Sequence, residues 1–164
     1  MEKIKVLIAD DIVSMAEVLK QQLEKFEDVE VVGIAVDGQD EVEKIEELKP
    51  DLVFTDNQMP KLNGIDVVDF VRNSAIEKKP DFVIITGDND FDLMKRAFSL
   101  DVLRLIHKPC DERKITEVLE QYRQKVTVFE NIEETAKNIK EIVKERKEKE
   151  GFLSKIINKF KERK

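Results

Sequence analysis

The sequence has one cysteine, no tryptophan, five glycines and four prolines among 164 residues. A lone Cys110 excludes an internal disulfide and is typical of a reducing compartment. The few glycines and prolines exclude a low-complexity or collagen-like chain. No run approaches the roughly 20 apolar residues of a membrane-spanning helix, and two aspartates closely follow the short apolar run at the N-terminus, unlike a secretory leader. We therefore expect a cytoplasmic protein that depends on a buried core.

The charge is unevenly distributed along the chain. Residues 137–164 carry 11 Lys/Arg against 5 Asp/Glu, which leaves 18 against 31 for residues 1–136. Hydrophobic residues make up 41% of the chain, too many for a disordered protein. The length suits one domain with a short appendage. We therefore predict an acidic domain over residues 1–124 and a helical tail over residues 125–164.

Short apolar runs alternate with stretches that have helical spacing. The predicted strands are Ile4–Ala9, Val29–Val36, Leu52–Thr55, Phe82–Thr86 and Val102–Ile106. The predicted helices are Val13–Phe26, Glu41–Leu48, Ile65–Val71, Phe91–Phe98 and Ile115–Tyr122. In the first helix, the expected apolar face consists of Met15, Val18, Leu19, Leu23 and Phe26. This alternation predicts an α/β fold with a parallel sheet covered on both faces.

Acidic and polar residues stand where the predicted strands end. Asp10 and Asp11 follow the first strand, Asp56 the third, Thr86 closes the fourth and Lys108 follows the fifth. Ligands of open parallel sheets bind at the carboxyl ends of the strands, so these residues are expected to converge. Clustered carboxylates suit Mg²⁺, and an aspartate can accept a phosphoryl group. A neighbouring ammonium and a hydroxyl would stabilise the transferred group.

These residues stand in the segments LIADD, FTDNQMPKLNG, VIITGD and HKPCD, and with them the sequence resembles the receiver domain of two-component response regulators from Lys3 to about Arg123. The resemblance implies a doubly wound sheet of order 2-1-3-4-5. It also implies that a sensor histidine kinase phosphorylates Asp56, after which Thr86 and Lys108 move toward the phosphoryl group. The receiver itself would catalyse only its own phosphorylation and dephosphorylation, so we expect no separate enzyme activity.

The resemblance further implies a set of metal ligands. Mg²⁺ would be held by Asp11, Asp56 and the main-chain carbonyl of Gln58, with Asp10 helping directly or through water. Three positions depart from the family pattern. Leu105 replaces the usual aromatic switch residue, Asp101 replaces the usual glycine after the fourth helix, and Gly87 replaces the usual Ala or Ser. We expect a different output signal from Leu105 and an intact turn at Asp101.

The tail has apolar residues at spacings of three or four. They are Leu119, Tyr122, Val126, Phe129, Ile132, Ala136, Ile139 and Val143, a coiled-coil-like pattern with one slip. The fifth helix either continues through this pattern or breaks at residues 125–128, with a new cap at Asn131. Residues 152–164 form a basic amphipathic segment. It would pack on its own tail or a second copy, enter a partner's groove, or contact an anionic membrane surface.

The sequence therefore favours a switch in which phosphorylation changes homodimerisation or docking to a downstream protein through the tail. One alternative is a transcriptional or RNA-binding regulator that uses the basic end of the chain. Another is a phosphorelay or phosphate-sink receiver, whose phosphotransfer is the whole function. The tail is too short for a winged-helix domain, so DNA binding is not expected.

Overall fold

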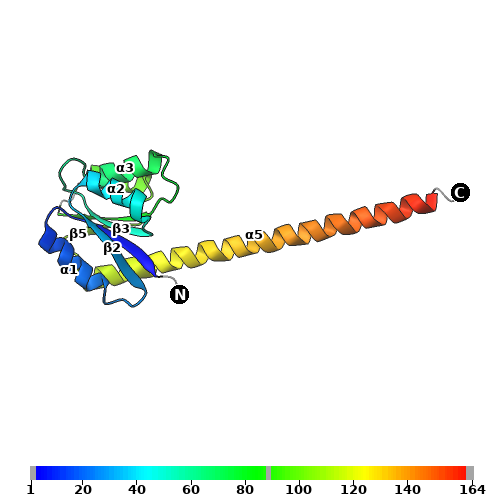
Figure 1. The fold of residues 1–164 in the computed structure, drawn as a ribbon, viewed down its shortest axis with the longest axis horizontal. Helices are drawn as coiled ribbons and strands as arrows, with labels where there is room; N and C mark the ends of the chain where they lie inside the picture. The colour runs from blue at the N-terminus through cyan, green and yellow to red at the C-terminus, as the bar shows by residue number, and fades with distance from the viewer. Residues whose placement is uncertain (1–2, 88–89, 162–164) are drawn as a thin grey trace. The chain divides into compact units, whose positions relative to one another are not determined.

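The computed structural model describes residues 3–87 and 90–161 and divides into two units, Met1–Glu120 and Gln121–Lys164 (Figure 1). The first unit contains a five-stranded sheet with helices on both faces. The second unit is helical. Among the described residues, no helix combines the length and the apolar character needed to cross a membrane.

All five strands are parallel and follow the order β2-β1-β3-β4-β5, as predicted. The strands are β1 (Ile4–Ala9), β2 (Val29–Ala35), β3 (Leu52–Asp56), β4 (Asp81–Thr86) and β5 (Arg104–His107). The strand order reverses between β1 and β3, where consecutive crossovers lie on opposite faces of the sheet. In open parallel sheets, ligands bind at such a switch point, at the carboxyl ends of the strands.

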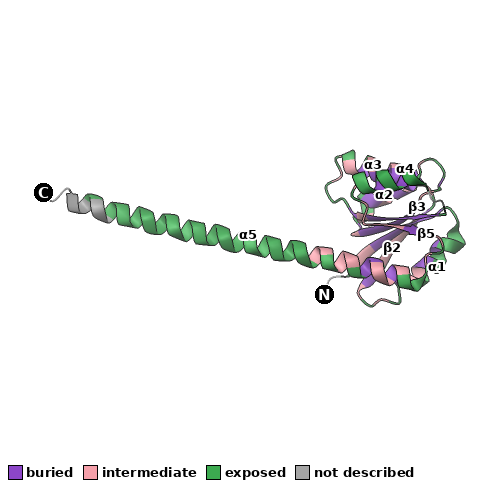
Figure 2. Cartoon of the chain, turned by 180° about the vertical axis from the view of Figure 1, so that it is seen from behind, coloured by how far each residue is buried: buried purple, intermediate pink, exposed green. Residues whose placement is uncertain are grey.

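The helices form one layer on each face of the sheet. They are α1 (Val13–Leu23), α2 (Gly38–Leu48), α3 (Gly64–Asn73), α4 (Phe91–Ser99) and α5 (Glu112–Lys161). Helix α1 and the first turns of α5 cover one face, and α2, α3 and α4 cover the other (Figures 1 and 2). Strand β3 is buried along its whole length, as expected for a central strand covered on both sides.

Helix α5 is continuous from Glu112 to Lys161, so the alternative with a break at residues 125–128 and a new cap at Asn131 is wrong. The β-branched residues at 126–128 disfavour a helix only weakly, and no Gly or Pro stands between Pro109 and Gly151. The helix includes most of the basic segment 152–164. Arg163 and Lys164 of that segment lie outside the described residues.

The apolar face predicted for α1 is partly wrong. Met15 and Val18 are 47% and 52% exposed, whereas Ala16, Leu19 and Leu23 are buried. These three lie at i, i+3 and i+7, and the small Ala16 lets the helix approach the sheet closely. Phe26 lies beyond the end of the helix. The small Ala16 therefore faces the core, and the larger side chains of Met15 and Val18 face away from it.

Asp101 forms the turn after α4 with a left-handed backbone, as the sequence predicted. Its φ is 53°, and the Val102 N–H donates to the Ala97 carbonyl across the turn. A side chain in this conformation is strained, and glycine is not. The aspartate therefore keeps the turn at some cost in stability.

Replacing Asp101 by glycine should raise the free energy of unfolding by about 0.5–1 kcal/mol, because glycine adopts this conformation without strain. Urea unfolding measures the change. Ser99→Gly, at the last residue of α4, serves as the control and should lower stability, because glycine is a poorer helix former than serine. A loss of stability in Asp101→Gly would mean that the aspartate side chain stabilises the turn.

Candidate functional site

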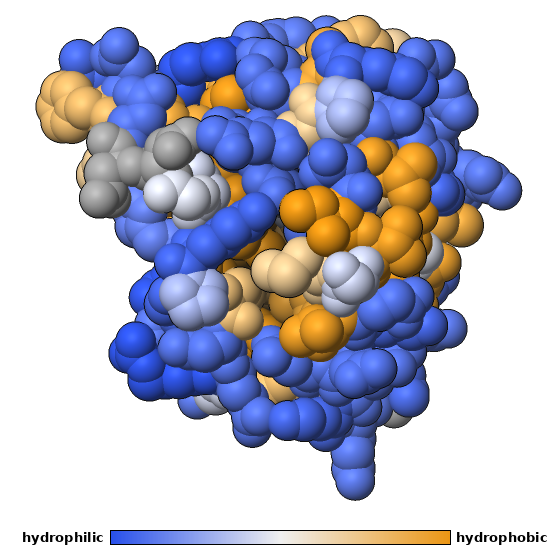
Figure 3. Space-filling model, turned by 90° about the vertical axis from the view of Figure 1, so that its left-hand side faces the viewer, coloured by the Kyte–Doolittle hydropathy of each residue, from blue (hydrophilic) through white to orange (hydrophobic). Residues whose placement is uncertain are grey.

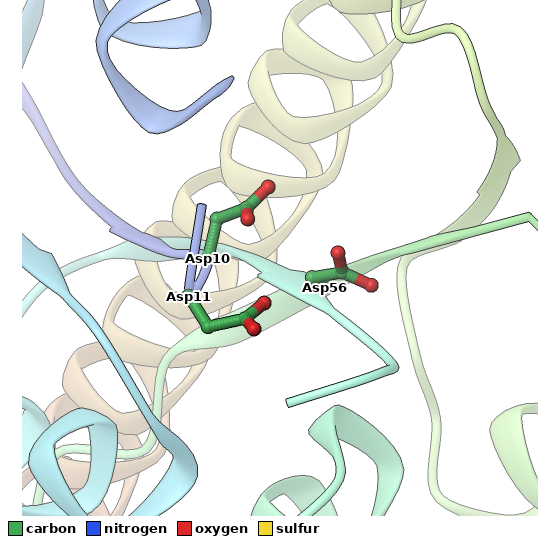
Figure 4. A group of neighbouring side chains, drawn as sticks. All are labelled: Asp10, Asp11 and Asp56. Carbon is green, nitrogen blue, oxygen red and sulfur yellow. The ribbon is translucent and has the colours of Figure 1, made fainter. Parts of the chain in front are cut away.

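Three carboxylates meet at the switch point of the sheet. Asp10 and Asp11 follow β1 and Asp56 ends β3, and each offers an oxygen within 4.8 Å of the others (Figure 4). Asp10 and Asp56 are buried, and Asp11 is exposed. Main-chain N–H groups orient the buried pair: Ile12 donates to Asp10 Oδ1 at 2.8 Å, and Gln58 donates to Asp56 Oδ1 at 2.9 Å. The predicted acidic residues are thus brought together.

Lys108 forms an ion pair with the other carboxylate oxygen of Asp56, through Nζ and Oδ2. Its own N–H donates to the Thr86 carbonyl at 2.8 Å, which fixes the end of β5 beside the end of β4. Burial lowers the pKa of Lys108, but the hydrogen bond and charge of Asp56, with Asp10 and Asp11, outweigh it and raise the pKa. Burial, reinforced by the charge of Asp56, raises the pKa of Asp10.

This donor set fits a hard divalent cation. Three carboxylates face one ammonium, so the site keeps an excess of negative charge, and carboxylate oxygens are ligands that Mg²⁺ prefers. Gln58 lies two residues beyond Asp56, and its side chain is exposed. A role for its main-chain carbonyl as a ligand stays a prediction.

The remaining residues that the sequence singled out lie in or next to β4 and β5. Thr86 is buried at the end of β4, in register with His107 of β5. His107 is exposed. Leu105 is half-buried and packs against the apolar core below α4. Burial raises the pKa of the Cys110 thiol to about 11, so this cysteine stays protonated and unreactive at neutral pH.

Exposed apolar side chains accompany the acidic cluster. Ile12, Val13 and Met15, at the start of α1, are each about half exposed. Figure 3 views the molecule from the end at which α1 begins and shows apolar surface between polar side chains. An acidic site beside exposed apolar residues suits contact with another protein.

Glu41 is a buried acid, for which the sequence pattern predicted only a place at the start of a helix. It lies in the first turn of α2, fully buried, with Oε2 at 2.9 Å from Thr55 Oγ1. Within the described structure, Oε1 has no hydrogen-bond partner. Burial raises the pKa of Glu41 to about 8. Its position four residues before the core residue Ile45 was the available signal, because both then lie on one face of the helix.

Comparison with known proteins identifies the first unit. The model of the family described as "Response regulator receiver domain" matches residues 6–120. The chain is 33% identical over 121 residues to the sensory transduction protein LytT of Bacillus anthracis, covering 74% of this chain and 48% of LytT. It therefore spans about half the length of that relative.

Solved structures agree with this match. The response regulator domain of CheB from Thermotoga maritima is 32% identical with a TM-score of 0.64, covering 75% of this chain and 96% of that domain. A chain of the CheX–CheY–BeF3–Mg²⁺ complex from Borrelia burgdorferi is 26% identical with a TM-score of 0.65, covering 72% of this chain and 87% of that one. Each of these two likenesses thus covers about three quarters of this chain and most of the solved one.

Glu41 predicts a pH dependence of stability. Below pH 4.5 the carboxyl is protonated in both states, so it contributes no dependence. As the pH rises from 4.5 to about 8, the unfolded chain releases a proton that the folded chain retains, so the folded state loses up to about 1.4 kcal/mol per pH unit.

Urea unfolding of the wild type and Glu41→Gln across this range isolates the effect. The stability of the wild type relative to the variant should fall with rising pH and level off above pH 8. A difference that does not change with pH would show that Glu41 ionises normally in the folded protein.

Proposed function

The chain belongs to the response regulator receiver family through residues 6–120, and from this membership we propose that it is a phosphorylation switch with Asp56 as the phosphoacceptor. The cluster of Asp10, Asp11 and Asp56 beside Lys108 carries the proposal. A cytoplasmic sensor histidine kinase would supply the phosphoryl group. No catalytic output role is proposed.

The transfer follows from the placement of the side chains. An Asp56 carboxylate oxygen attacks phosphorus, the P–N bond to the kinase histidine breaks, and its electron pair returns to the imidazole. Asp10, Asp11 and Asp56, with the Gln58 carbonyl, would hold Mg²⁺, which when bound neutralises phosphoryl oxygens. Lys108 transfers its ammonium contact from Asp56 to the new phosphoryl group. The Thr86 hydroxyl then donates to that group and carries the change toward β5 and α4.

The tail supplies the output in this proposal. Its exposed apolar residues include Val128, Phe129, Ile132, Ile139, Ile142 and Val143. At 100° per residue they fall within one stripe, and Glu134, Lys137 and Glu141 lie opposite. A helix of this kind is stabilised by packing against another apolar surface. We propose that phosphorylation alters the association of this stripe with a second copy or with another protein.

Incubation of the full chain with acetyl phosphate and Mg²⁺ should add one phosphoryl group, detected by intact mass. Asp56→Asn should abolish the addition, because the amide is not a nucleophile for this transfer. Asp92→Asn, an exposed aspartate at the start of α4, is the matched control and should load normally. Undiminished loading in Asp56→Asn would assign the phosphoacceptor elsewhere.

The output proposal predicts that light scattering detects a change in molecular mass when the wild type is phosphorylated. Ile139→Ala should weaken the association at least several-fold without altering loading, because it removes apolar surface from the stripe. Lys137→Ala truncates an exposed residue of the opposite face to the same size and should behave like the wild type. Equal behaviour of the two variants would exclude this stripe as the contact surface.

A further inference from the structure

The start of α2 lies directly against the loop that follows the phosphoacceptor. The Gly38 N–H donates to the Pro60 carbonyl at 3.3 Å, and Lys61 Nζ lies 2.8 Å from Asp37 Oδ2. A Cβ atom on Gly38 would lie 2.4 Å from the Leu62 carbonyl oxygen, so only glycine permits this approach. Helix α2 and residues 57–63 are therefore held against each other.

Below this contact, Glu41 is linked to the main chain of Asp56 through Thr55. Thr55 Oγ1 lies 2.9 Å from Glu41 Oε2 and 3.3 Å from the Asp56 carbonyl oxygen. Threonine has one hydroxyl hydrogen, and a carbonyl oxygen only accepts. Both contacts are therefore hydrogen bonds only when Glu41 is protonated, so that it donates to Thr55 and Thr55 donates to Asp56.

The surroundings favour this protonated form. Glu41 is fully buried, and burial raises its pKa even though the Thr55 hydrogen bond lowers it. In the described part of the chain, the ion pairs at the start of α2 are Asp37–Lys61 and Asp40–Lys44, and neither includes Glu41. A carboxylate without a cation is costly to bury, so the neutral acid is the stable state.

Gly64 closes the other side of the same carbonyl group. A Cβ atom there would lie 2.6 Å from the Asp56 carbonyl oxygen and 2.9 Å from Thr55 Oγ1. The Gly64 N–H donates to the Asn57 carbonyl at 3.2 Å. The peptide group that follows Asp56 is thus enclosed between Thr55 and the start of α3.

We propose that Glu41 is a positioning residue for phosphotransfer, which acts through Thr55 to hold the main-chain carbonyl of Asp56. The inference rests on the proposed role of Asp56 as phosphoacceptor. Holding this carbonyl orients the main chain between Asp56 and Gln58, so that the Gln58 N–H donates to Asp56 Oδ1 at 2.9 Å. Glu41 thereby fixes the reactive carboxylate of Asp56 although Glu41 does not contact that carboxylate.

If Glu41 positions Asp56, Glu41→Leu should raise the melting temperature and yet slow phosphorylation. If Glu41 had a purely structural role, the more stable variant would be phosphorylated at the wild-type rate. The leucine removes a buried carboxyl group with one unpartnered oxygen, so it should raise the melting temperature. It also removes the donor to Thr55, so it should slow phosphorylation of Asp56 by about 2- to 10-fold, the range of one net hydrogen bond. Glu41→Gln should retain the wild-type rate, because its amide N–H can donate to Thr55.

The experiment measures the initial rate of loading of the full chain with acetyl phosphate and Mg²⁺ near neutral pH, together with the melting temperature. Thr55→Val should slow loading to the same extent, and adding Glu41→Leu to it should cause no further loss. Ile45→Ala, one turn later in α2 and fully buried, is the control. It should lower the melting temperature and leave the loading rate unchanged.

The outcomes separate this inference from the proposed function. A wild-type rate in Glu41→Leu, or equal slowing in Ile45→Ala, would overturn the positioning role while leaving Asp56 as phosphoacceptor. Independent effects of Glu41→Leu and Thr55→Val would also overturn it, because the two residues act in one chain of hydrogen bonds. Failure of the wild type to load with acetyl phosphate and with a phosphorylated histidine kinase would overturn the proposed function itself.

Discussion

Like charges held close together at the end of a parallel sheet are the constraint on which this structure depends. The carboxylates of Asp10, Asp11 and Asp56 repel one another, and the nearby ammonium of Lys108 offsets part of that repulsion. The sheet keeps them together because each lies at the carboxyl end of a strand whose position is set by main-chain hydrogen bonds and a buried core. The stability of the core is thus used to maintain an arrangement that the side chains alone would not adopt.

The sequence predicted the features that follow from strand periodicity. The central strands β1, β3 and β4 are mostly apolar, and Asp56, Thr86 and Lys108 lie at strand ends where parallel topology brings them together. The order of the strands came from the family resemblance, because alternation alone does not determine it. The left-handed turn at Asp101 could be predicted because the family resemblance places a glycine there and aspartate tolerates the same backbone conformation.

What the sequence did not predict depends on packing. In α1 the helical period allowed more than one face, and the small Ala16, rather than Met15 or Val18, decided which face meets the sheet. Glu41 is polar in the sequence, and only its three-dimensional surroundings show that it is buried against Thr55. The choice between a broken and a continuous α5 rested on small differences in helix propensity, which spacing does not resolve.

Both oxygens of the Asp56 carboxylate already have partners, the Gln58 N–H on Oδ1 and the Lys108 ammonium on Oδ2. Each oxygen keeps a second lone pair, so the carboxylate stays open to a reactant, and an incoming group with negative charge also gains the Lys108 ammonium as a partner. An electrophile without such charge gains no contact from this lysine. The lysine that assists transfer therefore also favours anionic reactants over other reagents that would modify the aspartate.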